Sequence, residues 1–190
     1  MARQSGRGLV LYMQQTWLKS RNDMADGTAI ALMAGGYALN VALVYQDALT
    51  RQWAGRVRDR MAEVVGEAAI RCTEWKISDL RERRAFSEGA AVLARADVIV
   101  VSLYAAERLP AIFYLWVNLW LQQRSGLPGA LVALVLSPEE SNPAATNETR
   151  RYLAAVASQD CLEFFLQECN QPGESIPDLR EDIMRWAEAA

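Results

Sequence analysis

The sequence has no histidine and only three cysteines in 190 residues. The absence of histidine excludes a Ser-His-Asp triad, a Cys-His dyad, zinc bound by histidine and ordinary histidine acid–base catalysis. Cys72, Cys161 and Cys169 are odd in number, far apart and outside any CxxC pair, so they predict neither a disulfide framework nor a metal site. Because unpaired cysteines are typical of a reducing compartment, we expect a cytoplasmic protein.

The chain also lacks an excess of positive charge and a long apolar run. Its 20 Lys and Arg residues against 23 Asp and Glu residues give a formal charge of −3, so no global positive field favours nucleic acid. The longest apolar stretch, from Pro110 to Leu121, is interrupted by Asn118 and is shorter than the roughly 20 residues that span a bilayer. We therefore expect neither nucleic-acid binding nor a transmembrane helix.

Several functional motifs are missing as well. The chain contains no GxGxxG, Walker A or GxSxG sequence, and these motifs place backbone amides around phosphates or expose a serine nucleophile. Their absence removes the best support for a dinucleotide-binding, ATP-binding or serine-hydrolase function. The composition, with 52% apolar and 23% charged residues, is that of a globular protein, and we assign no catalytic residue from it.

A change in charge divides the chain near residue 38. Residues 1–38 carry four basic and two acidic side chains, for a charge of +2, which leaves −5 for residues 39–190. An export signal is one interpretation of this segment, but its apolar run over 9–13 is too short for one. We expect a loosely structured extension or short helix over 1–38 and a single domain over 39–190.

From residue 39 onward, short β-rich runs alternate with helical patterns, which is typical of parallel β-α units. Continuously apolar runs predict strands buried on both faces, whereas alternation predicts an edge strand. The predicted central strands are 39–45, 97–103 and 130–136, the edge strand is 69–75, and a fifth candidate is 162–166. Amphipathic helices are predicted over 49–65, after Ser78 or Asp79, after Asn142 and near Pro177. The fold class is therefore α/β, a doubly wound parallel sheet between helices.

The helix predicted over residues 110–123 is apolar on two sides. By the 3.6-residue period one face carries Ile112, Trp116 and Leu119, and the other carries Tyr114, Val117 and Leu121. One face covers the sheet, and the other needs a cover from the N-terminal extension, a neighbouring helix or a second subunit. A homodimer through this helix is thus one expected partnership.

A ligand site in an open parallel sheet lies beyond the carboxyl ends of the strands, where the strand order reverses. That rule selects the loops 45–51, 102–109 and 137–142. In the first loop Thr50 and Arg51 are candidates for contact with a phosphate. The alternative is that Asp47 or Thr50 caps the following helix while Arg51 lies on a solvated face.

Four segments of the chain carry a family resemblance: the stretch 96–102, the Leu109-Pro110 pair, the helix reaching Trp120 and the strand 129–135. Together they resemble the corresponding segments of the flavodoxin-like NADPH-dependent FMN reductases. This resemblance implies a three-layer α/β/α fold with five parallel strands in the flavodoxin-like order 2-1-3-4-5. It also implies FMN as cofactor and a role in NAD(P)H-dependent flavin reduction or electron transfer. The flavin-binding residues implied are Gln46, Asp47, Thr50, Arg51, Ser102, Tyr104, Ala105, Glu107 and Ser137, with Tyr104 near the isoalloxazine ring.

Two alternatives remain beside this one. The family's Ser/Gly/Arg-rich phosphate loop is not recognisable in this chain, so a flavodoxin-like interaction module without FMN is the first. The second is a pseudo-receiver, because the same architecture resembles response-regulator receiver domains and Asp47 and Ser137 match two of their positions. Ser102 stands where the phosphoacceptor Asp would be, and Glu168 lies near the position of the Lys. Such a protein would work through protein contacts alone.

Overall fold

The computed structural model describes residues 38–106, 108–124, 126–137, 143–170 and 179–189. All of them belong to one compact unit that begins at Ala38. The extension predicted over residues 1–38 lies outside the described residues, Ala38 excepted. No helix in the described part of the chain is long and apolar enough to cross a membrane.

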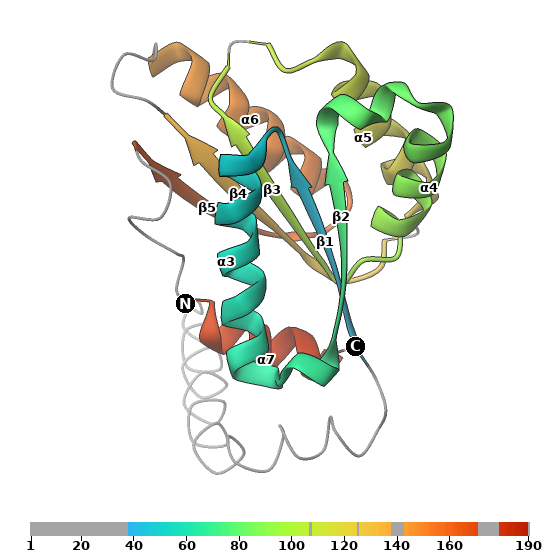
Figure 1. Cartoon of the computed structure of the whole chain (residues 1–190), viewed down its shortest axis with the longest axis vertical. Coiled ribbons are helices and arrows are strands. Elements are labelled where there is room, and N and C mark those ends of the chain that lie inside the picture. The colour runs from blue at the N-terminus through green and yellow to red at the C-terminus, as the bar shows by residue number, and fades with distance from the viewer. Residues whose placement is uncertain (1–37, 107, 125, 138–142, 171–178, 190) are drawn as a thin grey trace, which may run out of the picture. The chain divides into compact units, whose positions relative to one another are not determined.

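Five parallel strands form one sheet in the order β2-β1-β3-β4-β5 (Figure 1). The strands are β1 (Leu39–Tyr45), β2 (Ile70–Lys76), β3 (Val98–Tyr104), β4 (Ala130–Leu136) and β5 (Glu163–Cys169). The predicted α/β class, the all-parallel pairing and the strand order are confirmed. β4 is buried along its whole length, whereas β2 alternates between exposed and half-buried residues, as an edge strand does.

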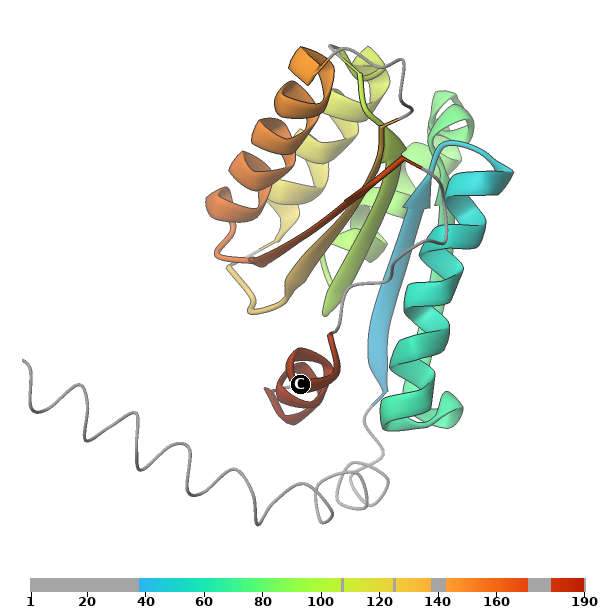
Figure 2. The same cartoon turned by 90° about the vertical axis from the view of Figure 1, so that its left-hand side faces the viewer.

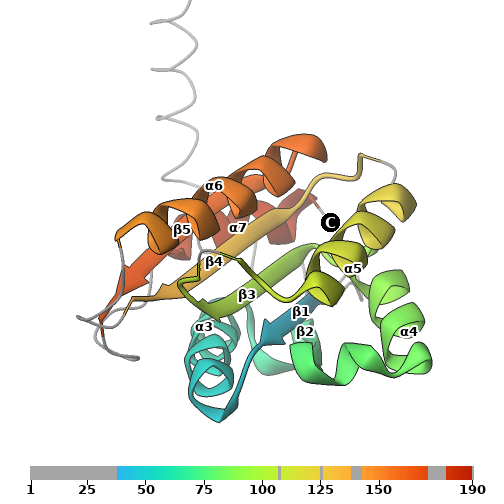
Figure 3. The ribbon, with the colours of Figure 1, turned by 90° about the horizontal axis from the view of Figure 1, so that it is seen from above.

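Helices cover both faces of the sheet (Figures 2 and 3). They are α3 (Ala48–Val65), α4 (Arg83–Leu93), α5 (Ala111–Gln123), α6 (Pro143–Gln159) and α7 (Arg180–Ala189), with short 3-10 turns η1 (Glu67–Ala69) and η2 (Ile77–Arg81). α4, α5 and α6 share one apolar core with the sheet, while α3 packs on β1 and β3 from the other side and contacts α7. The predicted helix after Ser78 is thus divided into η2 and α4.

The buried face of α5 differs from both predicted faces. Phe113, Trp116, Val117 and Trp120 are buried, a stripe at spacings of three and four residues, while Leu115 on the opposite side is 60% exposed. The cover for Val117 therefore comes from the same chain. α5 packs beside α4, and the Trp116 Nε1–H donates to the Phe86 carbonyl at 2.9 Å. The predicted faces were wrong because a helix without charged residues has no polar side that fixes its rotation.

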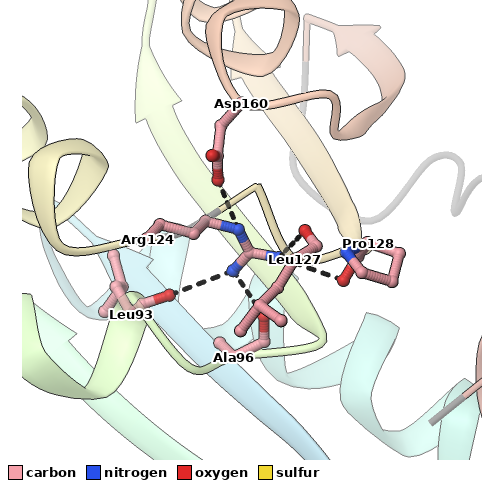
Figure 4. A network of polar contacts seen from close by, with 6 residues as sticks. All are labelled: Leu93, Ala96, Arg124, Leu127, Pro128 and Asp160. Atoms are coloured by element: carbon pink, nitrogen blue, oxygen red, sulfur yellow. Dashed lines mark hydrogen bonds and ion pairs between the residues drawn. The ribbon is translucent and has the colours of Figure 1, made fainter.

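The buried side chain of Arg124 connects several elements at the amino-terminal ends of the strands (Figure 4). Arg124, which follows α5, donates to the carbonyls of Ala96 at 2.7 Å, Leu127 at 3.0 Å and Pro128 at 3.1 Å, and its Nε lies 2.5 Å from Asp160 Oδ2. The charge is thus paired and hydrogen-bonded, which a buried guanidinium requires. This network lies at the end of the strands opposite to the predicted site.

Candidate functional site

The carboxyl ends of β1, β3 and β4 lie together at one edge of the sheet, here called the rim, which Figure 3 views from above. Strand pairing places Tyr45 beside Ser102, and Tyr104 beside Leu136. The chain leaves β1 toward β2 on one side and returns to β3 on the other, so the order reverses between β1 and β3. By the rule for open α/β sheets, the ligand crevice is expected between those two strand ends.

The β1–α3 loop forms a capping box. Asp47 Oδ1 accepts hydrogen bonds from the Leu49 amide at 3.1 Å and the Thr50 amide at 2.9 Å. Thr50 Oγ1 in turn accepts from the amides of Gln46 at 3.0 Å and Asp47 at 2.9 Å. The interpretation that Asp47 or Thr50 caps the helix is confirmed, and both residues take part.

Arg51 turns away from this loop toward the edge of the sheet. Its Nε lies 2.6 Å from Glu74 Oε2 on β2, and its side chain is 57% exposed. The guanidinium carbon also lies 5.9 Å from the ring centroid of Tyr45. Arg51 therefore lies on a solvated face, as the alternative interpretation expects, and its charge is balanced by Glu74.

Gln46 bridges the two strands that flank the expected crevice. Its Oε1 accepts a hydrogen bond from the Tyr104 amide at 2.6 Å, so a side chain that follows β1 is bound to the last residue of β3. This contact occupies a backbone donor that faces the point where the strand order reverses.

Asp47 and Tyr104 influence each other's protonation. Burial raises the pKa of Asp47, but hydrogen bonds from Thr50, from the Tyr104 hydroxyl and from the Leu49 amide outweigh it, so the pKa is lowered. The pKa of Tyr104 is raised, first by burial and then by the neighbouring Asp47. At neutral pH the rim therefore carries an ionised carboxylate beside a neutral phenol.

The loop after β3 is held by backbone and threonine contacts. The Ala105 amide donates to the Leu136 carbonyl at 2.8 Å. Thr149, buried on α6, accepts from the Ala106 amide at 3.1 Å and donates to the Ala106 carbonyl at 3.0 Å. Glu107, a predicted flavin contact in this loop, lies outside the described residues.

The two predicted serines have different positions. Ser102 is fully buried, and its Oγ has no hydrogen-bond partner within the described ranges, so it offers no surface to a ligand at the rim. Ser137 follows β4; its amide donates to the Cys169 carbonyl at 2.8 Å, and its Oγ lies 2.8 Å from Thr146 Oγ1. Residues 138–142 of its loop lie outside the described part of the chain.

Two further residues at the rim, Thr146 and Thr149, are not among the predicted site residues. Both lie on α6, three residues apart and therefore on one side of the helix. The spacing could have identified them from the sequence, since two threonines near the start of the helix after the loop 137–142 can both reach the rim.

The rim residues do not fit the phosphate of FMN. A phosphate at a helix N-terminus needs free backbone amides and benefits from the positive end of the helix dipole. Here the amides of Gln46, Asp47, Leu49 and Thr50 already donate to side chains of the same loop. The ionised Asp47 would also repel a phosphate, and Arg51 is paired with Glu74 instead of facing the loop. Among the described residues no group of acidic or cysteine side chains could hold a metal ion either.

Comparison with known proteins identifies the fold but no close relative. No family model matches the chain, and no curated protein matches it. A short-chain flavodoxin associated with a non-canonical PDU bacterial microcompartment is 16% identical with a TM-score of 0.50, covering 80% of this chain and 95% of that chain. An oxidoreductase from Corynebacterium diphtheriae is 16% identical with a TM-score of 0.55, covering 80% and 93%. The chain therefore has a flavodoxin-like fold.

Proposed function

We propose that this chain is a noncatalytic flavodoxin-like interaction module that works without FMN. The observation that carries the proposal is the capping box of the β1–α3 loop, in which Asp47 and Thr50 occupy the amides that a cofactor phosphate would need. The side chains at the rim bind to one another and to the backbone. Asp47 serves as a helix cap whose Oδ1 is taken up by donors of its own loop, and we assign no acid–base or nucleophilic role to it or to Tyr104.

A flavin titration tests this proposal directly. The purified full chain is added to FMN and, in parallel, to riboflavin, which has the same ring but no phosphate, and the flavin fluorescence is followed. We expect no saturable quenching of either flavin at micromolar concentration. Saturable quenching of FMN would overturn the proposal, and would restore Tyr104 and Ala105 as the residues beside the ring.

Equal quenching of FMN and riboflavin would also overturn the proposal, and it would show that the protein binds the ring and not the phosphate. The variant Tyr104→Leu would then weaken binding of both flavins, because an aromatic side chain stacked on the ring would be lost. A matched control is Tyr114→Leu, which alters a tyrosine on α5 whose hydroxyl accepts from the Leu109 amide at 3.0 Å.

For the partner, we propose a second copy of this chain that packs on the outward side of α5. No residue of Ala111–Gln123 is charged, and charged residues are depleted in the cores of protein interfaces. Leu115, at 60% exposure, lies on this side, and Ile112 and Leu119 beside it are half-buried, because each also packs against the core of its own chain. Antiparallel contact of two such helices would bury apolar side chains without burying a charge.

A further inference from the structure

We propose that the chain supplies its own anion at the rim: the Asp47 carboxylate occupies the N-terminus of α3, where a phosphate could otherwise bind, while the Gln46 side chain occupies the Tyr104 amide beside it. This inference rests on the proposed function, because it explains how the rim is satisfied without a cofactor.

The first support is the position and bonding of the carboxylate. Asp47 lies directly before α3, a helix of 18 residues whose N-terminal end has the positive pole of the helix dipole. Its Oδ1 accepts from the Leu49 amide, the Thr50 amide and the Thr50 hydroxyl at 2.9 to 3.1 Å. These are the donors and the charge that attract phosphate groups to helix N-termini in proteins.

The second support is independent of the helix. Gln46 Oε1 accepts from the Tyr104 amide at 2.6 Å and so joins the ends of β1 and β3. Ligands of open α/β sheets bind beyond these strand ends. Because Gln46 already fills the Tyr104 amide, that donor is not open to a ligand there.

The third support is that the residues that follow β3 and β4 are also held by side chains of the same chain. Thr149 binds both the amide and the carbonyl of Ala106, and Ser137 Oγ lies against Thr146 Oγ1. Polar atoms of the rim are thus paired from one loop to the next. Removal of one of these side chains would free the backbone amides that it now binds. Asp47 is the best residue to replace, because it is the charged one.

The test removes Asp47 and supplies a free anion. Thermal unfolding of the full chain is measured for the wild type, Asp47→Ala and Asp47→Asn, in inorganic phosphate and in sodium chloride at matched ionic strength. Asp59→Ala is the control, because it removes the same charge from the same helix at an exposed position (its carboxylate lies 2.8 Å from Arg58) without touching the cap. Matching the ionic strength separates phosphate binding from general screening.

We expect Asp47→Ala to lower the unfolding temperature by about 2–4 °C in chloride, since an N-cap is lost. Phosphate should restore part of that loss, over and above the general gain that a kosmotropic salt gives to the wild type and Asp59→Ala alike. Asp47→Asn keeps the capping acceptor, so it should show little response to phosphate beyond this general gain. If Asp47→Ala does not fold, a phosphate titration of the wild type still decides, because a gain that saturates shows an open anion site, whereas the kosmotropic gain rises steadily with concentration.

Two results would overturn the inference. One is a wild type that is stabilised by phosphate as strongly as Asp47→Ala, and the other is an Asp47→Ala variant that responds no more than Asp59→Ala. Both outcomes are separate from failure of the proposed function, which shows as flavin binding by the wild type in the absence of added phosphate.

Discussion

Arg124 Nε and Asp160 Oδ2 lie 2.5 Å apart in the interior, where the two side chains are 1% and 7% exposed. The other guanidinium nitrogens donate to backbone carbonyls that precede β3 and β4. The pair therefore joins the end of α5, the end of α6 and the starts of two central strands, and it does so at the side of the sheet away from the rim.

Replacement of Arg124 by methionine should be strongly destabilising. Arg124→Met keeps an apolar stem but leaves Asp160 buried without a counter-charge, and breaking a buried pair in this way costs about 3–5 kcal/mol. Urea unfolding measures the loss. Arg150→Met is the control, because Arg150 is half exposed and 3.8 Å from Glu168, and its loss should cost less than about 1 kcal/mol. Equal effects of the two variants would contradict this role for Arg124.

Replacement of both partners should cost less than the two single losses together. Burial is the largest influence on both groups, and it lowers the pKa of Arg124 and raises the pKa of Asp160, so both charged forms are disfavoured by desolvation. The double variant Arg124→Met/Asp160→Leu removes both charges at once. A double-mutant cycle in urea should show a coupling of about 1–3 kcal/mol, and additive losses would contradict it.

Two glycines should respond in opposite directions to alanine. A Cβ on Gly129 would lie 2.5 Å from Arg124 Nη2 and 2.7 Å from the Asp97 carbonyl oxygen, so the variant should lose about 1–3 kcal/mol. A Cβ on Gly55, inside α3, meets no atom within 4 Å, and alanine there should gain about 0.5–1 kcal/mol through helix propensity. Chemical denaturation of both variants checks the contrast, and a stabilising Gly129→Ala would show that the packing is looser than described.

The charge of Asp47 should make stability depend on pH. Because the pKa of Asp47 is lowered in the folded state, its contribution is present above the unfolded value of about 3.9 and is lost as the pH falls through the folded value. The free energy of unfolding of wild type minus that of Asp47→Asn should therefore be positive at neutral pH and shrink below about pH 5. A difference that grows on acidification would contradict the assignment, and Asp59→Asn controls for the loss of one charge.

Self-association should depend on Leu115. Light scattering coupled to size exclusion should give a dimer for the wild type. Leu115→Glu should raise the dimer Kd at least tenfold, or about 1.4 kcal/mol, because a carboxylate would be buried in the interface between the two α5 helices. Leu49→Glu changes another exposed leucine, on α3, and should leave the dimer intact. A wild-type monomer at every concentration would rule out the assembly.

The sheet could be predicted from the sequence because its central strands are continuous apolar runs. The runs 39–45 and 130–136 coincide with β1 and β4, and β3 begins one residue later than expected. The alternation of strands and helices sets the parallel pairing. β5 was the least clear, since its polar Gln167 and Glu168 hide the extension of the strand to Cys169.

The contacts between elements could be predicted only in part. The capping box joins Asp47 to Thr50 within one turn, so it can be read locally. The bond from Gln46 to the Tyr104 amide depends on the register of β1 against β3, and the Arg124–Asp160 pair depends on how α5 and α6 end. No local pattern encodes such pairs, because the partners meet only once the sheet has formed.

The charged residues of the two outer strands limit how the sheet can grow. Arg71, Glu74 and Lys76 are exposed along β2, and on β5 Glu168 is exposed and Glu163 is held 2.8 Å from Arg185. An incoming strand would have to bury these charges or break their pairing. The native structure therefore opposes the growth of fibrils by pairing at the edge strands, and substitutions that remove these charges should increase aggregation.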